Sequence, residues 1–272
     1  MKKNILKLTA LCIICALIFT FKSCKNPDFS PKDIESEQLQ EPLTRSGDLS
    51  WDYPIKPGME EWNSLKTEKE RIAVLQVPES ILASLSSEEV VGLCITFPSF
   101  GHFTAWDTPQ ESFNVMLSRY NILRHLLSRR DAGKYLIFAY KDVDLLSGFK
   151  TLPYSNRFFN IRLYYIELLL AQKEILQSLS SEERLELMIA AREKFYEKIG
   201  NEAFASLPGI CFTSRIMASI LDVEKYPEFE TSANRQSSAK LIQTGWFFDD
   251  VQPIEEVVRI SDNYINEKNE IK

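Results

Sequence analysis

The sequence is poor in the residues that carry most enzyme chemistry. Only two of its 272 residues are histidines, and five are cysteines. It contains no Walker A loop, no GxGxxG element and no GxSxG element, so the signatures of nucleotide-binding proteins and serine hydrolases are missing. No Cys/His spacing suggests a metal site, and we predict neither a metal nor a cofactor. The sequence therefore names no reaction.

Strand patterns and excess positive charge are missing as well. Nowhere does a sustained alternation of apolar and polar residues run between hairpin turns. The net charge is −6, and residues 1–23 hold four lysines and no acid, so the remainder carries −10. An acidic body repels phosphate backbones, and we predict no nucleic-acid partner.

The N-terminus has the three parts of an export signal. Lys2 and Lys3 form a positive start, residues 8–21 form an apolar run, and Ser23-Cys24 follows it. This arrangement resembles a bacterial lipoprotein signal, in which the cysteine of the lipobox becomes the first mature residue and carries the acyl chains. The resemblance implies lipid attachment at Cys24, with palmitate among the chains, and a membrane partner through that lipid.

The lipobox departs from the usual pattern, because Phe21 is bulky and Lys22 is charged. An uncleaved membrane anchor over residues 5–21 is the alternative, although Lys7 shortens it. Both interpretations place the body of the protein outside the cytoplasm, in the cell envelope. The lipid would hold it on the periplasmic side or on the outer surface of the outer membrane.

Three segments follow from these patterns. Residues 1–23 are the expected signal peptide. Residues 24–50 are rich in Pro, Ser, Glu and Gln with few aromatic residues, and they cannot bury enough apolar surface to offset the entropy of ordering. We predict a disordered tether there and a single helical domain over residues 51–272.

The cysteines that remain after cleavage and acylation are Cys94 and Cys211, because Cys12 and Cys15 leave with the signal. An oxidising compartment would permit a disulfide between them. Each lies in an apolar helical pattern, where a reduced cysteine behaves as a small core residue. This favours two separate buried thiols.

The most apolar part of the domain is the stretch 153–179. Its apolar residues recur at helical steps, and further apolar residues lie off that stripe, so the helix must be covered on most sides. Arg162 and Glu167 keep the clean apolar run below the roughly 20 residues that a bilayer core requires. We predict an all-α fold of stacked antiparallel helix pairs, an irregular α-solenoid or a multi-helix bundle, around this central helix.

Helix-start signals punctuate the rest of the domain. Capping patterns stand at Thr67-x-x-Glu70 and at Thr108-Pro109-x-Glu111. The segment Ile81–Glu89 recurs as Ile175–Glu183 with eight of nine residues identical, and each copy ends one helix and caps the next. Duplication of a helical unit explains this repeat, and a favourable helix–turn–helix sequence that arose twice explains it equally well. A helix over 131–140 is expected to turn its apolar residues inward, namely Tyr135, Leu136, Phe138 and Ala139.

Several short motifs together resemble one family. They are Tyr53-Pro-Ile-Lys-Pro-Gly-Met-Glu-Glu-Trp, Pro78-Glu-Ser-Ile-Leu, Phe97-Pro, Asp131-Ala-Gly-Lys and Leu168-Leu-Leu-Ala-Gln. The family is one of uncharacterised secreted or lipid-anchored helical proteins of anaerobic gut bacteria, and the resemblance covers residues 53–198. It implies a compartment and a helical fold, and it supplies no catalytic residue.

The candidate site residues come from the aromatic loop around His102. There His102, Trp106 and Asp107 form a candidate ligand surface for a protein or glycan, although the aromatic residues of the loop could simply pack a helix crossing. A triad of Cys94, His102 and Asp107 can be drawn, but Cys94 falls inside a helix and we predict no catalytic residue.

The predicted function is therefore a lipid-anchored envelope protein that acts as a non-enzymatic binding or structural module. The alternative is an envelope hydrolase that uses carboxylates or the His102 loop. Carboxylate pairs are abundant, but at helix starts their ordinary role is to complement the helix dipole.

Overall fold

The computed structural model describes residues 50–143, 155–200, 207–246 and 252–270. Within these ranges the chain is helical and contains no strand, so the predicted all-α fold is confirmed. The expected signal peptide, Cys24 and nearly all of the expected tether lie outside the described residues. No helix in the described ranges is long and apolar enough to cross a membrane.

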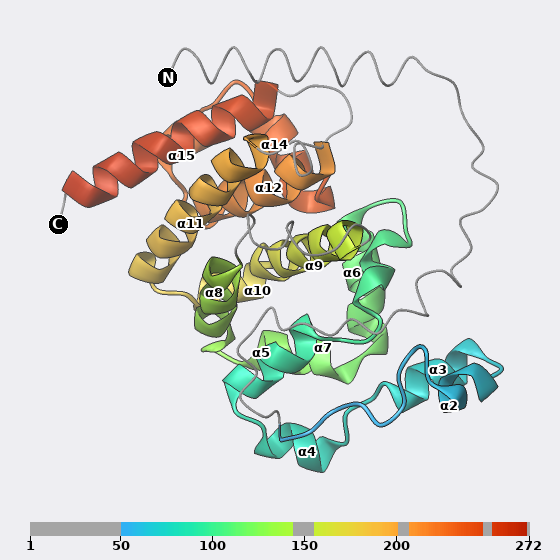
Figure 1. The fold of residues 1–272 in the computed structure, drawn as a ribbon. Helices are drawn as coiled ribbons and strands as arrows, with labels where there is room; N and C mark the ends of the chain where they lie inside the picture. Colours follow the sequence, from blue (N-terminus) through green and yellow to red (C-terminus); the bar gives the residue numbers. More distant parts are fainter. Residues whose placement is uncertain (1–49, 144–154, 201–206, 247–251, 271–272) are drawn as a thin grey trace, which may run out of the picture.

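Figure 1 shows the described helices in their order along the chain. The α-helices are α2 (Glu60–Ser64), α3 (Glu68–Val74), α4 (Glu79–Ser84), α5 (Ser87–Ile95), α6 (Pro109–Arg119), α7 (Asn121–Ser128), α8 (Ala132–Asp142), α9 (Ser155–Leu170), α10 (Lys173–Ser178), α11 (Ser181–Ile199), α12 (Leu207–Val223), α13 (Pro227–Glu230), α14 (Arg235–Thr244) and α15 (Gln252–Glu270), and a 3-10 helix, η2, covers Phe100–Thr104.

Helix α9 is the centre of the fold. Helices α5, α6 and α8 contact it from the earlier part of the chain, and α12 contacts it from the later part (Figure 1). Every residue from Leu163 to Leu170 is buried. Because an apolar helix must be covered on most sides, this is the environment that its sequence requires. The predicted central helix with packed helix pairs on both flanks is confirmed.

The central helix is shorter at its C-terminus than predicted. Helix α9 ends at Leu170, and Gln172 adopts an extended conformation (φ −70°, ψ 137°) before α10 begins. The Gln172 side-chain amide donates to the Leu168 carbonyl at 2.6 Å. This bond satisfies one of the carbonyls left without an intrahelical partner where a helix ends. The apolar period continues across the break, so periodicity alone could not locate it.

The prediction that Phe138 faces inward is wrong. Phe138 is 70% exposed, whereas Leu136, Ile137, Ala139 and Tyr140 of the same helix are buried. With about 3.6 residues per turn, one side of α8 cannot contain five consecutive positions. The helix packs both Leu136 and Tyr140 against its neighbours, and Phe138 lies on the opposite face.

The two copies of the repeated segment adopt the same local structure. Ser86 and Ser180 both form complete capping boxes, with glutamates Glu89 and Glu183. Their backbone angles agree closely, at φ −66° and ψ 162° for Ser86 and φ −67° and ψ 167° for Ser180. A short helix therefore ends and a longer helix begins in the same way at both places.

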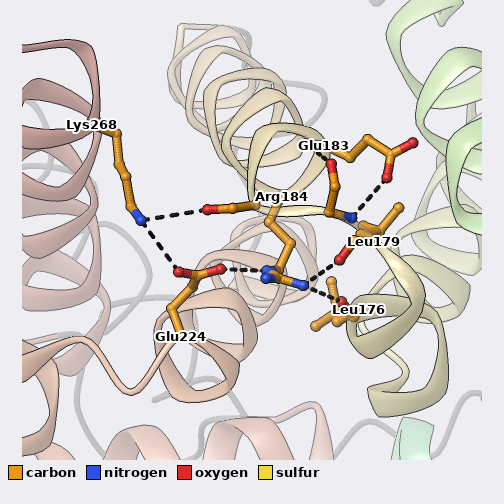
Figure 2. A network of polar contacts seen from close by, with 8 residues as sticks. Leu176, Leu179, Glu183, Arg184, Glu224 and Lys268 are labelled. Carbon is orange, nitrogen blue, oxygen red and sulfur yellow. Dashed lines mark hydrogen bonds and ion pairs between the residues drawn. The ribbon is translucent and has the colours of Figure 1, made fainter. Parts of the chain in front are cut away.

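An arginine side chain also donates to backbone carbonyls at each of the two turns, but the two arginines stand at positions that do not correspond between the copies. Arg129 donates to the carbonyls of Leu82 and Leu85 at 3.2 and 2.9 Å. In the second copy, Arg184 donates to the equivalent carbonyls of Leu176 and Leu179, and it also pairs with Glu224, which directly follows α12 (Figure 2). The carbonyls need a donor in both copies, and each copy obtains it independently.

We expect Ser180→Ala to lower the free energy of unfolding by about 1 kcal/mol, because the Glu183 amide loses its acceptor. Ser86→Ala should have a similar effect, since its bond to the Glu89 amide has the same geometry. Urea unfolding followed by circular dichroism measures both. An unchanged midpoint in either variant would contradict the capping role.

The two cysteines of the domain are reduced and buried in the core. This agrees with the prediction of two separate thiols. The segment before α2 is held against the domain by aromatic packing, because Tyr53 is buried with its ring 5.8 Å from that of Phe97.

Candidate functional site

A cavity of about 270 Å³ lies between α6, α10, α12 and α14, next to the C-terminal end of α9. Seven of its twelve lining residues are polar or charged and five are apolar, so the wall is more polar than that of a typical ligand pocket. The lining residues are Gln110, Phe113, Asn114, Leu117, Leu127, Ala171, Gln172, Lys173, Glu174, Arg215, Ile242 and Gln243. We refer to it as the Arg215 cavity.

Arg215 is the buried charge of this cavity. It lies in the middle of α12 and is only 3% exposed. Its Nε donates to the Ile242 carbonyl at 3.1 Å, and its Nη2 donates to Oε1 of Gln110. Its Nη1 is buried and has no hydrogen-bond partner. The guanidinium is therefore held in position by two contacts while one nitrogen remains unsatisfied.

No carboxylate in the described part of the chain forms an ion pair with Arg215. Burial lowers the pKa of Arg215 to about 10. The side chain nevertheless keeps its charge at neutral pH. An isolated buried charge is costly, so a buried cation is normally paired.

Two glutamines fix the polar side of the cavity. Gln110 Nε2 donates to Oε1 of Gln172 at 3.1 Å, and it also donates to Oδ1 of Asn114 at 2.9 Å. Gln110 is placed here because Thr108 and Pro109 start α6 immediately before it. Gln172 is placed here because it occupies the break between α9 and α10. The helix termini thus place both glutamines at the cavity.

Gly245 packs closely against the unsatisfied nitrogen of Arg215. It ends α14 in the left-handed region, at φ 78°, where glycine is favoured. A Cβ atom at this position would lie 3.1 Å from Nη1 of Arg215 and 3.2 Å from Cβ of Pro109. Both the backbone conformation and the close approach of the guanidinium to this residue depend on the missing side chain.

A second polar cluster lies deep in the core and joins four helices. Glu167 of α9 and Lys198 of α11 are completely buried, and Nζ of Lys198 lies 2.7 and 2.8 Å from the two carboxylate oxygens. Tyr140 of α8 and Thr213 of α12 donate to Oε1 of Glu167 at 2.9 and 2.7 Å. Lys198 also donates to the Gly209 carbonyl at 3.0 Å.

The Glu167–Lys198 cluster has the properties of a structural network. Burial lowers the pKa of Lys198, and the adjacent Glu167 opposes that effect. Burial, together with the Glu167 charge, raises the pKa of Tyr140 far above its ordinary value. None of these residues lines the Arg215 cavity. The cluster fixes the relative positions of α8, α9, α11 and α12.

The predicted surface residues lie on and after η2. His102 and Asp107 are exposed, and Trp106 is half-buried with the Arg119 guanidinium 5.4 Å from the centre of its ring. The Arg215 cavity is lined by other residues. The surface formed by His102, Trp106 and Asp107 stays a prediction.

Cys94 is unsuited to the nucleophile role that could be drawn for it. Its thiol is fully buried, where it lies 3.7 Å from the Ile122 carbonyl and can donate to it. Burial raises the pKa of the Cys94 thiol. Because the thiolate is the reactive form, this environment makes the residue inert.

Sequence reasoning missed Arg215, Gln110 and Gln172. One signal was present, because Arg215 is the single charged residue within the apolar run 207–221. A charge in such a run indicates either a buried partner or a site. Gln172 gave no signal, since it fell in register with a helix that in fact ends before it.

The residues that line the cavity could hold a small molecule. Among the described residues, no group of three or more His, Cys, Asp or Glu side chains lies close enough together to hold a metal ion. Comparison with protein-family models, with curated proteins and with solved structures gives no match for this chain. The function is therefore inferred from the geometry of the cavity and from the pattern of the N-terminus.

Proposed function

We propose that this protein is a lipid-anchored cell-envelope protein that binds a ligand in the Arg215 cavity without converting it chemically. The observation that supports binding is a cavity whose wall contains a buried arginine with no carboxylate partner among the described residues. A folded chain that leaves such a group without a partner loses stability, which a bound molecule would restore.

The anchor is supported by the sequence of the N-terminus. Lys2 and Lys3, the apolar run and Ser23-Cys24 have the order and lengths of a lipoprotein signal. The 26 residues from Lys25 to Ser50 would then connect the lipid to the helical domain. A flexible chain of that length has a root-mean-square reach of roughly 25–30 Å, which holds the domain clear of the headgroups.

The alternative of an envelope hydrolase has less support. The thiol that its His102 version would use is buried and has a raised pKa. The Arg215 cavity contains one carboxylate, that of Glu174, whereas glycosidases use two carboxylates on opposite sides of the scissile bond. Binding without conversion is the function that these groups can perform.

The anchor is tested by metabolic labelling with a palmitate analogue. We expect the wild-type chain to take up the label and Cys24→Ala to lose it, because the acyl acceptor is gone. Cys15→Ala is the matched control and should retain the label, since this cysteine leaves with the signal. Label on Cys24→Ala would contradict the assignment of the lipid site.

A further inference from the structure

We propose that the turn between α4 and α5 is a pH-sensitive switch, in which protonation of His125 releases Arg129 from the two backbone carbonyls that it caps. This inference is independent of the Arg215 cavity and of the lipid anchor. It follows from the contacts of the His125 ring, from the charges around the ring and from the different partner of the equivalent arginine in the repeated turn.

The His125 ring holds the guanidinium of Arg129 in place. Both Nε and Nη2 of Arg129 contact Nε2 of His125, at 3.1 and 2.8 Å. Because the nitrogens of an arginine can only donate, Nε2 is the acceptor and the ring is neutral, with its hydrogen on Nδ1. Nη2 of Arg129 also donates to the carbonyls of Leu82 and Leu85. The histidine therefore orients the arginine that completes the turn.

A proton on Nε2 of His125 is incompatible with this arrangement. The protonated ring has no acceptor, and its positive charge repels the guanidinium. The Leu82 carbonyl is placed to accept a hydrogen bond from the protonated ring. We therefore expect Arg129 to move away from the turn, and the Leu85 carbonyl to lose its side-chain donor.

The charges around the ring give the direction of the pH dependence. Arg129 and Glu79 of α4 act on His125, whereas α5, α6 and α10, which pack against α7, contribute no further charge that acts on it among the described residues. Burial, followed by the Arg129 charge, lowers the pKa of His125, and the Leu82 carbonyl and Glu79 oppose this effect. The neutral ring therefore stabilises the folded turn fully above the ordinary pKa of about 6.5. This contribution is lost as the pH falls from there through the lowered pKa of the folded state.

The repeated turn between α10 and α11 has no such histidine. Its arginine, Arg184, is held by the carboxylate of Glu224 while it donates to the equivalent carbonyls (Figure 2). Histidine is the side chain whose charge ordinarily changes between pH 5 and 8. The two turns share a sequence and a capping box, and they differ in the group that holds the arginine. The chain thus contains its own control.

The pH-sensitive turn lies at the edge of the fold. Helix α4 is at the periphery, and α2 and α3 extend away from the other helices (Figure 1). The core around α9 is formed by other elements. Release of Arg129 therefore loosens α4 and its junction with α5 and leaves the core folded.

The test is hydrogen exchange of the full chain, purified from membranes in a non-ionic detergent and measured by mass spectrometry at pH 8 and at pH 5. Division by the intrinsic exchange rate at each pH gives protection factors, which report local opening. We expect the protection of residues 79–90 to be at least about fivefold lower at pH 5, because hydrogen bonds to a charged donor are lost. The equivalent residues 173–184 should change by less than about twofold.

Four variants assign the effect. His125→Gln keeps an acceptor for Arg129 but does not titrate, so the protection of residues 79–90 should be equal at the two pH values. His102→Gln removes the other histidine of the chain and should retain the wild-type dependence. Arg129→Met should lower the protection at both pH values, whereas Arg130→Met, at the exposed neighbouring position, should not.

Three results would overturn the proposal. The first is unchanged protection of residues 79–90 at pH 5, which would mean that Arg129 is not released. The second is an equal response of the two turns, and the third is a pH dependence that persists in His125→Gln. None of these results bears on ligand binding in the Arg215 cavity or on the lipid at Cys24, so the proposed function is tested separately.

Discussion

Lys198→Met is expected to lower the free energy of unfolding by about 3–5 kcal/mol. The variant removes the cation from a carboxylate that is completely buried, so the charge of Glu167 is left without its partner. Tyr140 and Thr213 still donate to Oε1 of Glu167, but neutral donors do not replace an ammonium group at 2.7 Å. Urea unfolding, fitted to a two-state transition, measures the loss.

The matched control is Lys141→Met, the same chemical change in an exposed ion pair. Lys141 pairs with Glu186, and both side chains are about half exposed. Exposed ion pairs contribute about 0–1 kcal/mol, so the control should lose less than about 1 kcal/mol. Equal losses in the two variants would contradict the role of burial.

A double variant tests whether the loss comes from the unpaired charge. Glu167→Gln combined with Lys198→Met removes both charges, and a glutamine oxygen can still accept from Tyr140 and Thr213. Replacing a whole buried pair by neutral groups is often close to neutral in stability, in contrast to removing one member. We expect the double variant to be more stable than Lys198→Met, and a lower stability would contradict this explanation.

The local signals of the sequence predicted the fold well. The capping patterns at Thr67, Ser86, Thr108 and Ser180 all start helices, and the side chains of these residues accept the expected backbone N–H bonds. Such caps depend on residues that are three positions apart, so sequence contains all the information. The central helix was predictable for a related reason, because an apolar surface on most sides requires cover on most sides.

The Glu167–Lys198 cluster was not predictable, although one half of it was visible. Glu167 interrupts the most apolar stretch of the chain, but its partner lies 31 positions away on another helix. Lys198 stands near the end of a helix, where a basic residue ordinarily complements the dipole. Nothing in the local sequence distinguishes that exposed role from a fully buried one.

The Arg215 cavity required the tertiary arrangement for a further reason. Gln110 and Arg215 are 105 positions apart, and the Gln172 side chain comes from a helix break that the apolar period conceals. Phe138 is the opposite case, because its apolar side chain suggested a place in the core, whereas its position on α8 leaves it exposed. The packing of helices against one another decides which polar side chains come into contact. The spacing of residues along a single helix does not reveal these contacts.

Phe103→Ala is expected to lower the free energy of unfolding by about 3–5 kcal/mol. Phe103 belongs to η2 in the loop that contains His102, yet its side chain is buried. Its ring stacks against Tyr165 of α9 at 5.8 Å and meets Phe212 of α12 edge-on at 5.8 Å. The variant leaves a cavity against the central helix, and the surrounding helices cannot close it without losing their own contacts.

The chain provides a matched control in Phe138→Ala. This variant makes the same chemical change on α8 at a side chain that is 70% exposed, and it should change stability by less than about 1 kcal/mol. Asp107→Asn, an exposed change close to Phe103, should have a still smaller effect. If Phe103→Ala were as stable as these controls, the aromatic loop would not belong to the core.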